Sequence, residues 1–333
     1  MTTKHLWDII NYITFTSFPE VFFIKKLYFI FNPLSGKKNG KDTLKSNLIS
    51  IIDEMTKSGY EVTIRPTQCR LDACKAAEYV CSNENFDIIA CSGGDGTLNE
   101  VIQGIMTSER KVPVLYMPTG TTNDFARSLG ISTNPYEACR NIEYSSVFSC
   151  DICSFNDRFF TYVAAFGIFT EVVYETPQQS KNMLGHIAYI LEGMKRLNTI
   201  DKSYHIKITY DENTLEDDFI LGMITNSTSV GGLISTSSSV SLNDGIFEVT
   251  LIKKPHTIIE LQDILSTLLS QKKDIDASSS EYIVSLKTSC LKIESETEIS
   301  WTLDGEFGGT ENNVTIQNHV KAVDFIINSQ LKA

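Results

Sequence analysis

The chain has 333 residues, a length that suggests two domains of ordinary size. Hydrophobic residues make up 42% and charged residues 21%, a composition typical of globular proteins and unlike collagen-like or disordered chains. Lys and Arg number 29 against 41 Asp and Glu, for a net charge of −12. Such an acidic chain lacks the cations that neutralise nucleic-acid phosphates, so we expect no nucleic-acid partner.

Residues 26–145 are predicted to alternate between strands and helices. Short apolar runs typical of buried strands are Lys26–Phe31, Tyr60–Thr67, Phe86–Cys91 and Val112–Met117. Apolar residues at helical spacing lie between them, in Leu44–Met55, Leu71–Val80 and Leu98–Ile105. Strict alternation of strand and helix implies right-handed crossovers, so we expect an α/β domain with a doubly wound parallel sheet.

Residues 146–315 follow a different pattern, in which short segments alternate apolar and polar residues. These predicted strands are Val147–Phe155, Arg158–Val163, Tyr204–Tyr210, Phe219–Thr225, Ile246–Ile252, Tyr282–Leu286, Cys290–Ile293 and Ile299–Leu303. Two predicted helices interrupt them, Leu184–Leu197 and Thr257–Ser270. The pattern predicts a mostly antiparallel β-sandwich as the second domain, and we expect residues 316–333 to complete the first domain.

The cellular compartment is predicted from the absence of a membrane-spanning or signal-peptide pattern in the sequence. No stretch approaches the roughly 18 uncharged apolar residues of a spanning helix. Residues 1–25 form an apolar N-terminal extension, but Asp8 and Glu20 interrupt it and no signal-peptidase pattern follows. The extension fits either an interfacial helix or a start codon assigned too far upstream. Cys150 and Cys153 have metal-like spacing without further ligands, so we expect reduced thiols and a cytoplasmic protein.

Three predicted strands end in loops of unusual composition. These loops are Asn32–Lys37, Gly93–Thr97 and Pro118–Phe125. In an open parallel sheet, ligands bind at the carboxyl ends of the strands, where glycines admit phosphates and helix N-termini attract them. Each loop alone also suits a tight turn or a helix cap. Three of them at one sheet edge favour a nucleotide site.

The acidic residues of these loops point to a metal ion. Asp95 and Asp124 would repel a bare phosphate, so they imply a divalent cation between carboxylate and phosphate. Neither common phosphate motif is present, because Gly36-Lys37 is followed by Lys38 and no G-x-G-x-x-G occurs. The sequence therefore predicts a phosphate site of another kind.

The three loops together resemble those of the bacterial soluble diacylglycerol kinase family of lipid kinases. Gly93–Thr97 is also found in NAD kinases and phosphofructokinases, whereas Thr119–Phe125 is more specific to lipid kinases. The resemblance continues through Tyr174–Pro177, Leu242–Gly245 and Asp304–Gly309, and it spans Lys26 to Phe325. It implies an NAD kinase/phosphofructokinase-like first domain and a second domain, 146–315, that receives the lipid.

The resemblance also implies site residues. ATP contacts carry over onto Asn32, Pro33, Leu34, Ser35, Gly36, Lys37, Thr67, Gly93, Gly94, Asp95, Gly96, Thr97, Leu98, Asn99 and Thr121. Asp95 and Asp124 match the positions that organise the catalytic Mg²⁺. Glu306 matches the general base, with Asp304 as its partner, although Asp304-Gly305-Glu306 alone suits a hairpin turn.

The family carries a second, structural Mg²⁺ in the strand-rich domain. Asp244 matches its carboxylate ligand, and Ser241 and Ile246 match the residues that offer backbone carbonyls. An Asn-Asp-Gly turn between strands is the alternative explanation of the same residues.

The resemblance implies an ATP-dependent kinase, a transferase of lipid metabolism that converts diacylglycerol to phosphatidic acid. Phosphatidylglycerol, a sphingoid base or ceramide remain alternative acceptors, because the motifs specify phosphoryl transfer and not the acyl chains. An NAD kinase is disfavoured by its missing adenosine and ribose motifs. A catalytically silent nucleotide- or lipid-binding regulator is disfavoured because Asp95, Asp124, Asp304 and Glu306 are all present.

A water-insoluble substrate implies peripheral contact with the inner face of the membrane. Basic pairs such as Lys195-Arg196 and Lys253-Lys254 could supply electrostatic attraction, although a solvated face is the simpler explanation of each pair. The resemblance is also compatible with a homodimer.

Overall fold

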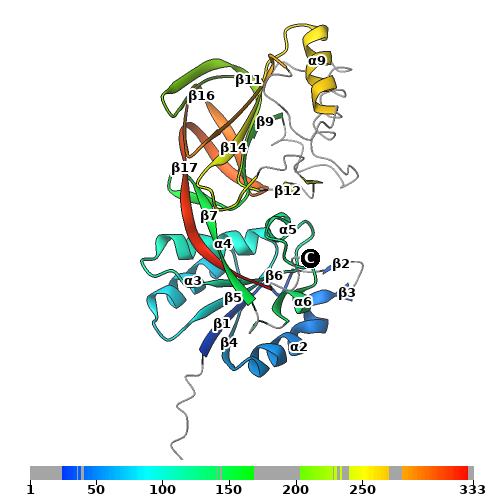
Figure 1. The fold of residues 1–333 in the computed structure, drawn as a ribbon, viewed down its shortest axis with the longest axis vertical. Helices are drawn as coiled ribbons and strands as arrows, with labels where there is room; N and C mark the ends of the chain where they lie inside the picture. Colours follow the sequence, from blue (N-terminus) through cyan, green and yellow to red (C-terminus); the bar gives the residue numbers. More distant parts are fainter. Residues whose placement is uncertain are drawn as a thin grey trace, which may run out of the picture.

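The computed structural model describes residues 25–35, 37–38, 41–140, 142, 145–168, 203–227, 229–230, 233–234, 240–269 and 280–328. It has an N-terminal α/β part and a strand-rich C-terminal part (Figure 1). The predicted helix Leu184–Leu197, the Tyr174–Pro177 motif and nearly all of the N-terminal extension lie outside the described residues. Within the described ranges, no helix is both long and apolar enough to cross a membrane.

The α/β part is built on four parallel strands. These are β1 (Lys25–Phe31), β4 (Tyr60–Pro66), β5 (Ile88–Gly93) and β6 (Val114–Pro118), in the order β6-β5-β1-β4. The helices are α2 (Thr43–Lys57), α3 (Asp72–Ser82), α4 (Asp95–Thr107), α5 (Asp124–Ser128) and α6 (Pro135–Cys139). Helices α3 and α4 lie on one side of the strands and α2 and α6 on the other (Figure 1). Every residue of β5 and β6 is therefore buried.

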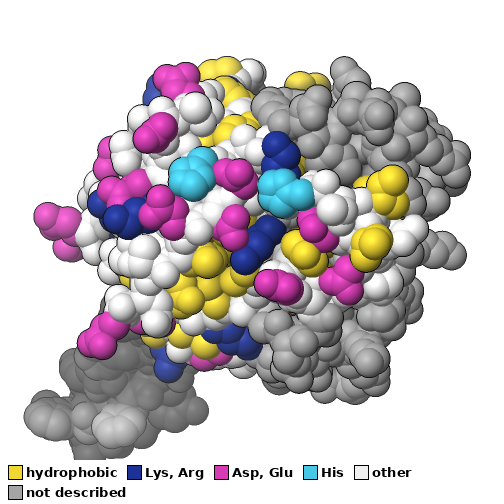
Figure 2. Space-filling view, turned by 90° about the horizontal axis from the view of Figure 1, so that it is seen from above, with side chains coloured by type: hydrophobic (Ala, Val, Ile, Leu, Met, Phe, Trp, Pro, Cys, Tyr) yellow, Lys and Arg dark blue, Asp and Glu magenta, His cyan; other side chains and the backbone are white. Residues whose placement is uncertain are grey.

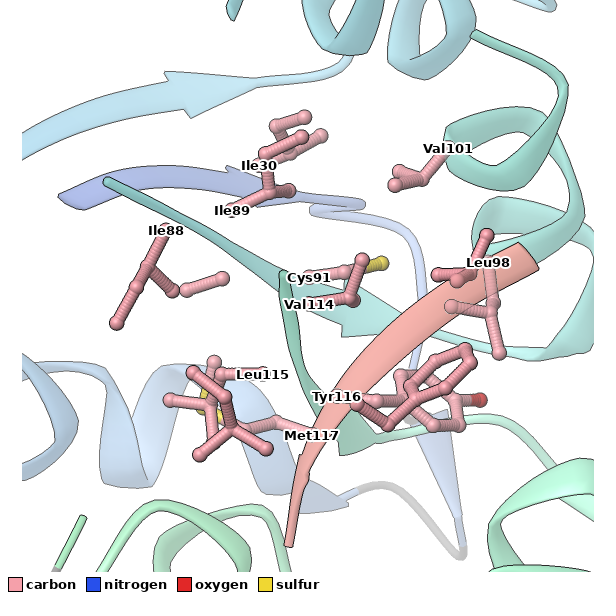
Figure 3. Packing of buried hydrophobic residues seen from close by; sticks show 14 of the residues in the cluster. Ile30, Ile88, Ile89, Cys91, Leu98, Val101, Val114, Leu115, Tyr116 and Met117 are labelled. Atoms are coloured by element: carbon pink, nitrogen blue, oxygen red, sulfur yellow. The ribbon is translucent and has the colours of Figure 1, made fainter. Parts of the chain in front are cut away.

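The core of this part fixes the start of α4. Leu98 and Val101 of α4 are fully buried and pack near Cys91 of β5 and Val114 of β6 (Figure 3). Burying one such side chain stabilises a fold by about 1.5–3 kcal/mol. The glycine-rich loop between β5 and α4 is thus held at both ends by the core. The side chain of Leu98 belongs to this core, although the residue was expected among the ATP contacts.

The strand-rich part contains long antiparallel strands. They are β7 (Ser145–Phe155), β8 (Arg158–Phe160), β9 (Val163–Gly167), β10 (Tyr204–Tyr210), β11 (Asn213–Thr225), β14 (Phe247–Lys253), β15 (Ile283–Thr288), β16 (Cys290–Leu303) and β17 (Glu306–Asn328). Helix α9 (Ile258–Leu269) follows β14. Buried aromatic rings pack edge-to-face at the centre of the strand-rich part. The ring centroid of Trp301 lies 5.0 Å from that of Phe155 and 4.9 Å from that of Phe166.

Strand β17 joins the two parts. It pairs with β16, runs antiparallel to β7, and pairs in parallel with β6 at Phe325 and Val114 (Figure 1). One sheet thus continues in the order β15-β14-β11-β10-β16-β17-β6-β5-β1-β4. No strand was predicted beyond Leu303, because glycine and asparagine pairs such as Gly308-Gly309 interrupt the apolar alternation. Long-range pairing overrides this weak local preference.

Two predicted strand boundaries were wrong. The segment Arg158–Val163 is not one strand: β8 ends at Phe160 and β9 begins at Val163, because the Asp304 carboxylate binds the amides of residues 161–163. Conversely, Cys290–Ile293 and Ile299–Leu303 belong to the single strand β16, whose pairing shifts register between Glu294 and Ile299. A β-bulge of this kind leaves no clear period in the sequence.

Candidate active site

The three predicted phosphate loops contact one another at the carboxyl edge of the parallel strands. The Thr119 hydroxyl donates to Ser35 Oγ over 3.0 Å, which joins the loop after β6 to the loop after β1. The Asn32 amide donates to Thr97 Oγ1 over 3.4 Å, which joins the loop after β1 to the start of α4. The structure therefore brings together residues from three separate motifs.

Close backbone packing explains the glycines. A Cβ on Gly120 would lie 2.6 Å from Gly94 Cα, and a Cβ on Gly93 would lie 2.4 Å from Thr97 Cβ. Neither position has room for a side chain. Gly94 is also the N-cap of α4 and supplies no side-chain cap, so the helix N-terminus is suited to bind an anion. The geometry matches a cradle for phosphate.

The remaining predicted ATP contacts lie around this cradle. Leu34 is 75% exposed, and the Thr67 amide donates to Phe31 O over 2.9 Å beside the first loop. Thr121 lies exposed in the third loop, and Pro33 is half-buried in the first. Gly36 is outside the described residues, and only the backbone of Lys37 is described, in the short strand β2 (Lys37–Lys38), which pairs with β3 (Lys41–Asp42).

Asp95 and Asp124 form an acidic pair, in which Asp124 is buried and Asp95 is partly buried. The Asp95 carboxylate accepts from the amides of Asp124 (3.2 Å) and Phe125 (3.4 Å), at the start of α5. Asp124 is only 1% exposed. Burial, followed by the negative charge of Asp124, raises the pKa of Asp95 to about 6. Two carboxylates held together against their mutual repulsion fit a divalent cation.

The ligand set of such a cation would come only partly from the protein. In the described parts of the chain, no group of three or more His, Cys, Asp or Glu side chains converges at metal-binding distance. Mg²⁺ usually keeps one or two carboxylates and takes its other ligands from phosphate oxygens and water. Asp95 and Asp124 beside a phosphate cradle fit that pattern.

Glu306 reaches the phosphate cradle from the other part of the chain. It is the first residue of β17, and its Oε1 lies 2.8 Å from the position of a Cβ on Gly96. A side chain at position 96 would have to displace this carboxylate, so the two parts of the chain approach each other closely here. The exposed Glu306 side chain therefore lies beside the N-terminus of α4. Gly96, which it approaches, directly follows Asp95 in the sequence.

Asp304 occupies a tight turn and is saturated with hydrogen bonds. Asp304 and Gly305 have φ angles of +49° and +80° and form the two-residue turn between β16 and β17, the alternative predicted for this motif. The Asp304 carboxylate accepts from Thr161 N (2.8 Å) and Oγ1 (2.9 Å), Tyr162 N (2.9 Å), Val163 N (3.1 Å) and Asn99 Nδ2 (2.8 Å). Burial raises the pKa of Asp304, whereas these amide donors lower it.

Two side-chain contacts near the acidic residues were not predicted from the sequence. Tyr162 falls inside a predicted strand, yet its hydroxyl lies 3.3 Å from the Cβ position of Gly305. Burial and the charges of Asp304 and Asp95 raise its pKa well above the usual value, so the phenol stays protonated. The Asn99 side-chain amide donates to Asp304, and the ATP contact expected of this residue stays a prediction. No local pattern marks either contact.

The predicted structural-magnesium residues form a turn before β14. Ser241 Oγ donates to Asn243 Oδ1 over 3.0 Å, and Ile246 N donates to Asp244 Oδ1 over 3.3 Å. The fully buried Asp151 accepts from Gly245 N over 2.7 Å and anchors this turn to β7. The Asn-Asp-Gly turn is thus present, and the metal site stays a prediction.

Comparison with known proteins identifies the family of this chain. Residues 26–155 match the diacylglycerol kinase catalytic domain. The chain is 32% identical over 287 residues to a diacylglycerol kinase of Bacillus subtilis, covering 86% of this chain and 91% of the relative. The chain belongs to the bacterial diacylglycerol kinase family. A diacylglycerol kinase of Staphylococcus aureus is also 32% identical, over 311 residues that cover 92% of this chain and 95% of the relative.

A solved structure supports the same assignment. A diacylglycerol kinase from Bacillus anthracis matches with a TM-score of 0.70 and 25% identity, over 92% of this chain and 98% of that chain. Membership makes this protein a lipid kinase that uses ATP and acts on a lipid substrate. The matched catalytic-domain range contains the phosphate loops and the acidic pair, whereas Asp304 and Glu306 lie beyond it.

Proposed function

We propose that this lipid kinase transfers the γ-phosphoryl group of ATP to the hydroxyl of diacylglycerol and releases phosphatidic acid and ADP. The observation that supports the proposal is the proximity of the Glu306 carboxylate to Gly96, at the N-terminus of α4 and beside the predicted phosphate loops. The relatives named diacylglycerol kinase, aligned over most of the chain, supply the substrate class.

The nucleotide would bind at the carboxyl edge of the parallel strands. The loops after β1, β5 and β6 and the N-terminus of α4 offer backbone amides and hydroxyls to the phosphates, as helix N-termini do for anions generally. Asp95 and Asp124 would hold Mg²⁺. The cation would neutralise phosphate charge and orient the transferred group.

Glu306 is the proposed general base. A lipid alcohol is a poor nucleophile at neutral pH, so a carboxylate that accepts its proton assists the attack. The hydroxyl proton passes to Glu306 as the new O–P bond forms and the bond to the bridging oxygen of ADP breaks. Tyr162, which burial and nearby carboxylates keep protonated, would donate a hydrogen bond within the site.

The strand-rich part is proposed to be a β-sandwich that receives the lipid, over residues 146–315. The α/β domain would comprise residues 26–145 and the end of the chain, and the pairing of Phe325 with Val114 supports this division. A second Mg²⁺ would stabilise the turn at Asp244, with the carbonyls of Ser241 and Ile246 as ligands.

A water-insoluble substrate supports peripheral contact with the cytoplasmic face of the membrane, and a homodimer is compatible with it. Lys253 forms an ion pair with Asp217 over 2.9 Å, so its charge is already neutralised. Seen from the strand-rich end, acidic side chains are interspersed with a few Lys and Arg residues (Figure 2). We therefore expect binding driven more by apolar contact than by charge, and flotation with neutral and anionic vesicles measures the difference.

The test of the proposed function is a labelled-ATP assay against lipids in mixed micelles. Label should enter phosphatidic acid with diacylglycerol present. Faster labelling of phosphatidylglycerol, a sphingoid base or ceramide would show that diacylglycerol is not the preferred acceptor, while the protein would still be a lipid kinase. Label in no lipid would favour a silent nucleotide- or lipid-binding regulator.

A further inference from the structure

The side chain of Asn99 joins the α/β part to the strand-rich part. Asn99 lies on α4, and its Nδ2 donates to Asp304 Oδ2 over 2.8 Å, across 205 residues of sequence. The same nitrogen donates to the backbone carbonyl of Phe159 over 3.2 Å. One amide group therefore contacts both the β16–β17 turn and strand β8.

Asp304 depends on Asn99 for its contact with α4. Four of the five hydrogen bonds to its carboxylate come from Thr161, Tyr162 and Val163, which belong to the strand-rich part. The fifth comes from Asn99. Without that donor, the turn would lose its hydrogen bond to the helix that carries Asp95 and Gly96, and its remaining hydrogen bonds to the strand-rich part would open more often.

The position of Glu306 follows from this contact. Glu306 is two residues beyond Asp304 in the same hairpin, and Gly96 is three residues before Asn99 on the same helix. Glu306 Oε1 lies 2.8 Å from the position that a Cβ on Gly96 would occupy. The Asn99–Asp304 hydrogen bond lies one helical turn away along α4, so it helps to fix this approach. A displacement of about 1 Å at reacting groups lowers rates by about 10²-fold.

We infer that Asn99 is a positioning residue that fixes Glu306 at the phosphate cradle by holding the Asp304 turn. The inference rests on the proposed function, and it assigns Asn99 a role other than the ATP contact implied by the family resemblance. Both donor hydrogens of the amide are engaged by Asp304 and Phe159, and its Oδ1 accepts from Gln103 Nε2 at 3.5 Å.

The test compares Asn99→Ala with the matched control Gln103→Ala. Gln103 lies one turn further along α4. Its side chain bonds the Phe159 backbone and reaches Asn99 Oδ1 only over 3.5 Å, without contacting Asp304. We expect Asn99→Ala to lower kcat about 10–100-fold with ATP affinity within about twofold of wild type. Gln103→Ala should lower the melting temperature similarly and keep kcat within about threefold. Tenfold weaker ATP binding in Asn99→Ala, or equal losses of kcat in both variants, would overturn the inference.

A double-mutant cycle tests whether Asn99 acts through Glu306. In a Glu306→Gln background, Asn99→Ala should cost less than about threefold in kcat, because the group it positions is already gone. If the loss of kcat in the double variant equals the product of the losses in the two single variants, the two residues act independently and the inference is contradicted.

Hydrogen exchange separates failure of the inference from failure of the proposed function. The Asp304 amide donates to Val163 O over 2.9 Å, so exchange in peptides covering residues 304–306 reports on the turn whether or not the protein phosphorylates a lipid. Faster exchange in Asn99→Ala than in Gln103→Ala is expected. Equal exchange in the two variants would overturn the positioning role, and an inactive wild type would overturn the function alone.

Discussion

Replacing Asp95 by Asn should stabilise the metal-free protein while removing a ligand of the proposed Mg²⁺ site. Burial and the charge of Asp124 raise the pKa of Asp95 to about 6, from an ordinary value of 3.8. Between these two values the folded state binds more protons than the unfolded state, so stability falls as pH rises through this window. Above about pH 6, the raised pKa of Asp95 lowers the free energy of unfolding by its full amount. That amount is on the order of 3 kcal/mol, at about 1.4 kcal/mol per pKa unit.

Asparagine removes the charge and keeps one oxygen for the α5 amides. Losing one of the two amide hydrogen bonds, 3.2 and 3.4 Å long, costs about 1–2 kcal/mol. The net gain from Asp95→Asn is therefore about 1–2 kcal/mol at pH 8, and it should disappear at pH 4, where Asp95 is protonated in the folded state.

The assay is urea unfolding in a chelator at pH 8 and pH 4, repeated with millimolar Mg²⁺. At pH 8 the variant should be the more stable protein in chelator, and Mg²⁺ should stabilise wild type more than the variant. A variant that is less stable than wild type at pH 8 in chelator would refute the account of a repulsive acidic pair. Equal stabilisation of both proteins by Mg²⁺ would refute the metal site.

The other predictions address the cradle, the buried phenol and the joint between the two parts. Gly94→Val should weaken ATP binding at least about tenfold by calorimetry, because its Cβ would lie 3.3 Å from Gly120 Cα; unchanged affinity in a folded variant would contradict the cradle. Tyr162→Phe should lower kcat while leaving the melting temperature within a few degrees, and unchanged kcat would remove the phenol from the site. Phe325→Ala should destabilise the protein by about 3–5 kcal/mol in urea unfolding, because its fully buried ring packs 5.3 Å from that of Phe125; a loss below about 1 kcal/mol would contradict that packing.

The parallel strands and the phosphate loops were predictable because their signals are local. Lys26–Phe31 is a continuous apolar run, and glycines follow the strand that ends at Gly93, so a short window of sequence contains both strand and loop. Strand β17 was not predictable, since its 23 residues contain Gly308, Gly309 and four asparagines and gain their order from pairing with distant strands.

In the candidate site, too, contacts between residues far apart in the sequence could not be predicted from local patterns. The proximity of Glu306 to the first loops was expected from the family resemblance and not from any spacing in the chain. The five donors around Asp304 come from residues more than 140 positions away, so the sequence gives no sign that this carboxylate anchors a turn. Asn99 was grouped with its loop neighbours because helix periodicity does not reveal what a polar residue contacts.

The measurement that tests the central claim most directly is phosphate transfer to diacylglycerol by wild type and by Glu306→Gln, at saturating ATP and lipid. Gln keeps the size of the exposed side chain, so ATP affinity and melting temperature should stay unchanged. Turnover should fall by roughly 10²–10⁴-fold, the usual contribution of a positioned general base. Turnover within about threefold of wild type, which is less than about 0.7 kcal/mol in barrier, would contradict the proposed role of Glu306.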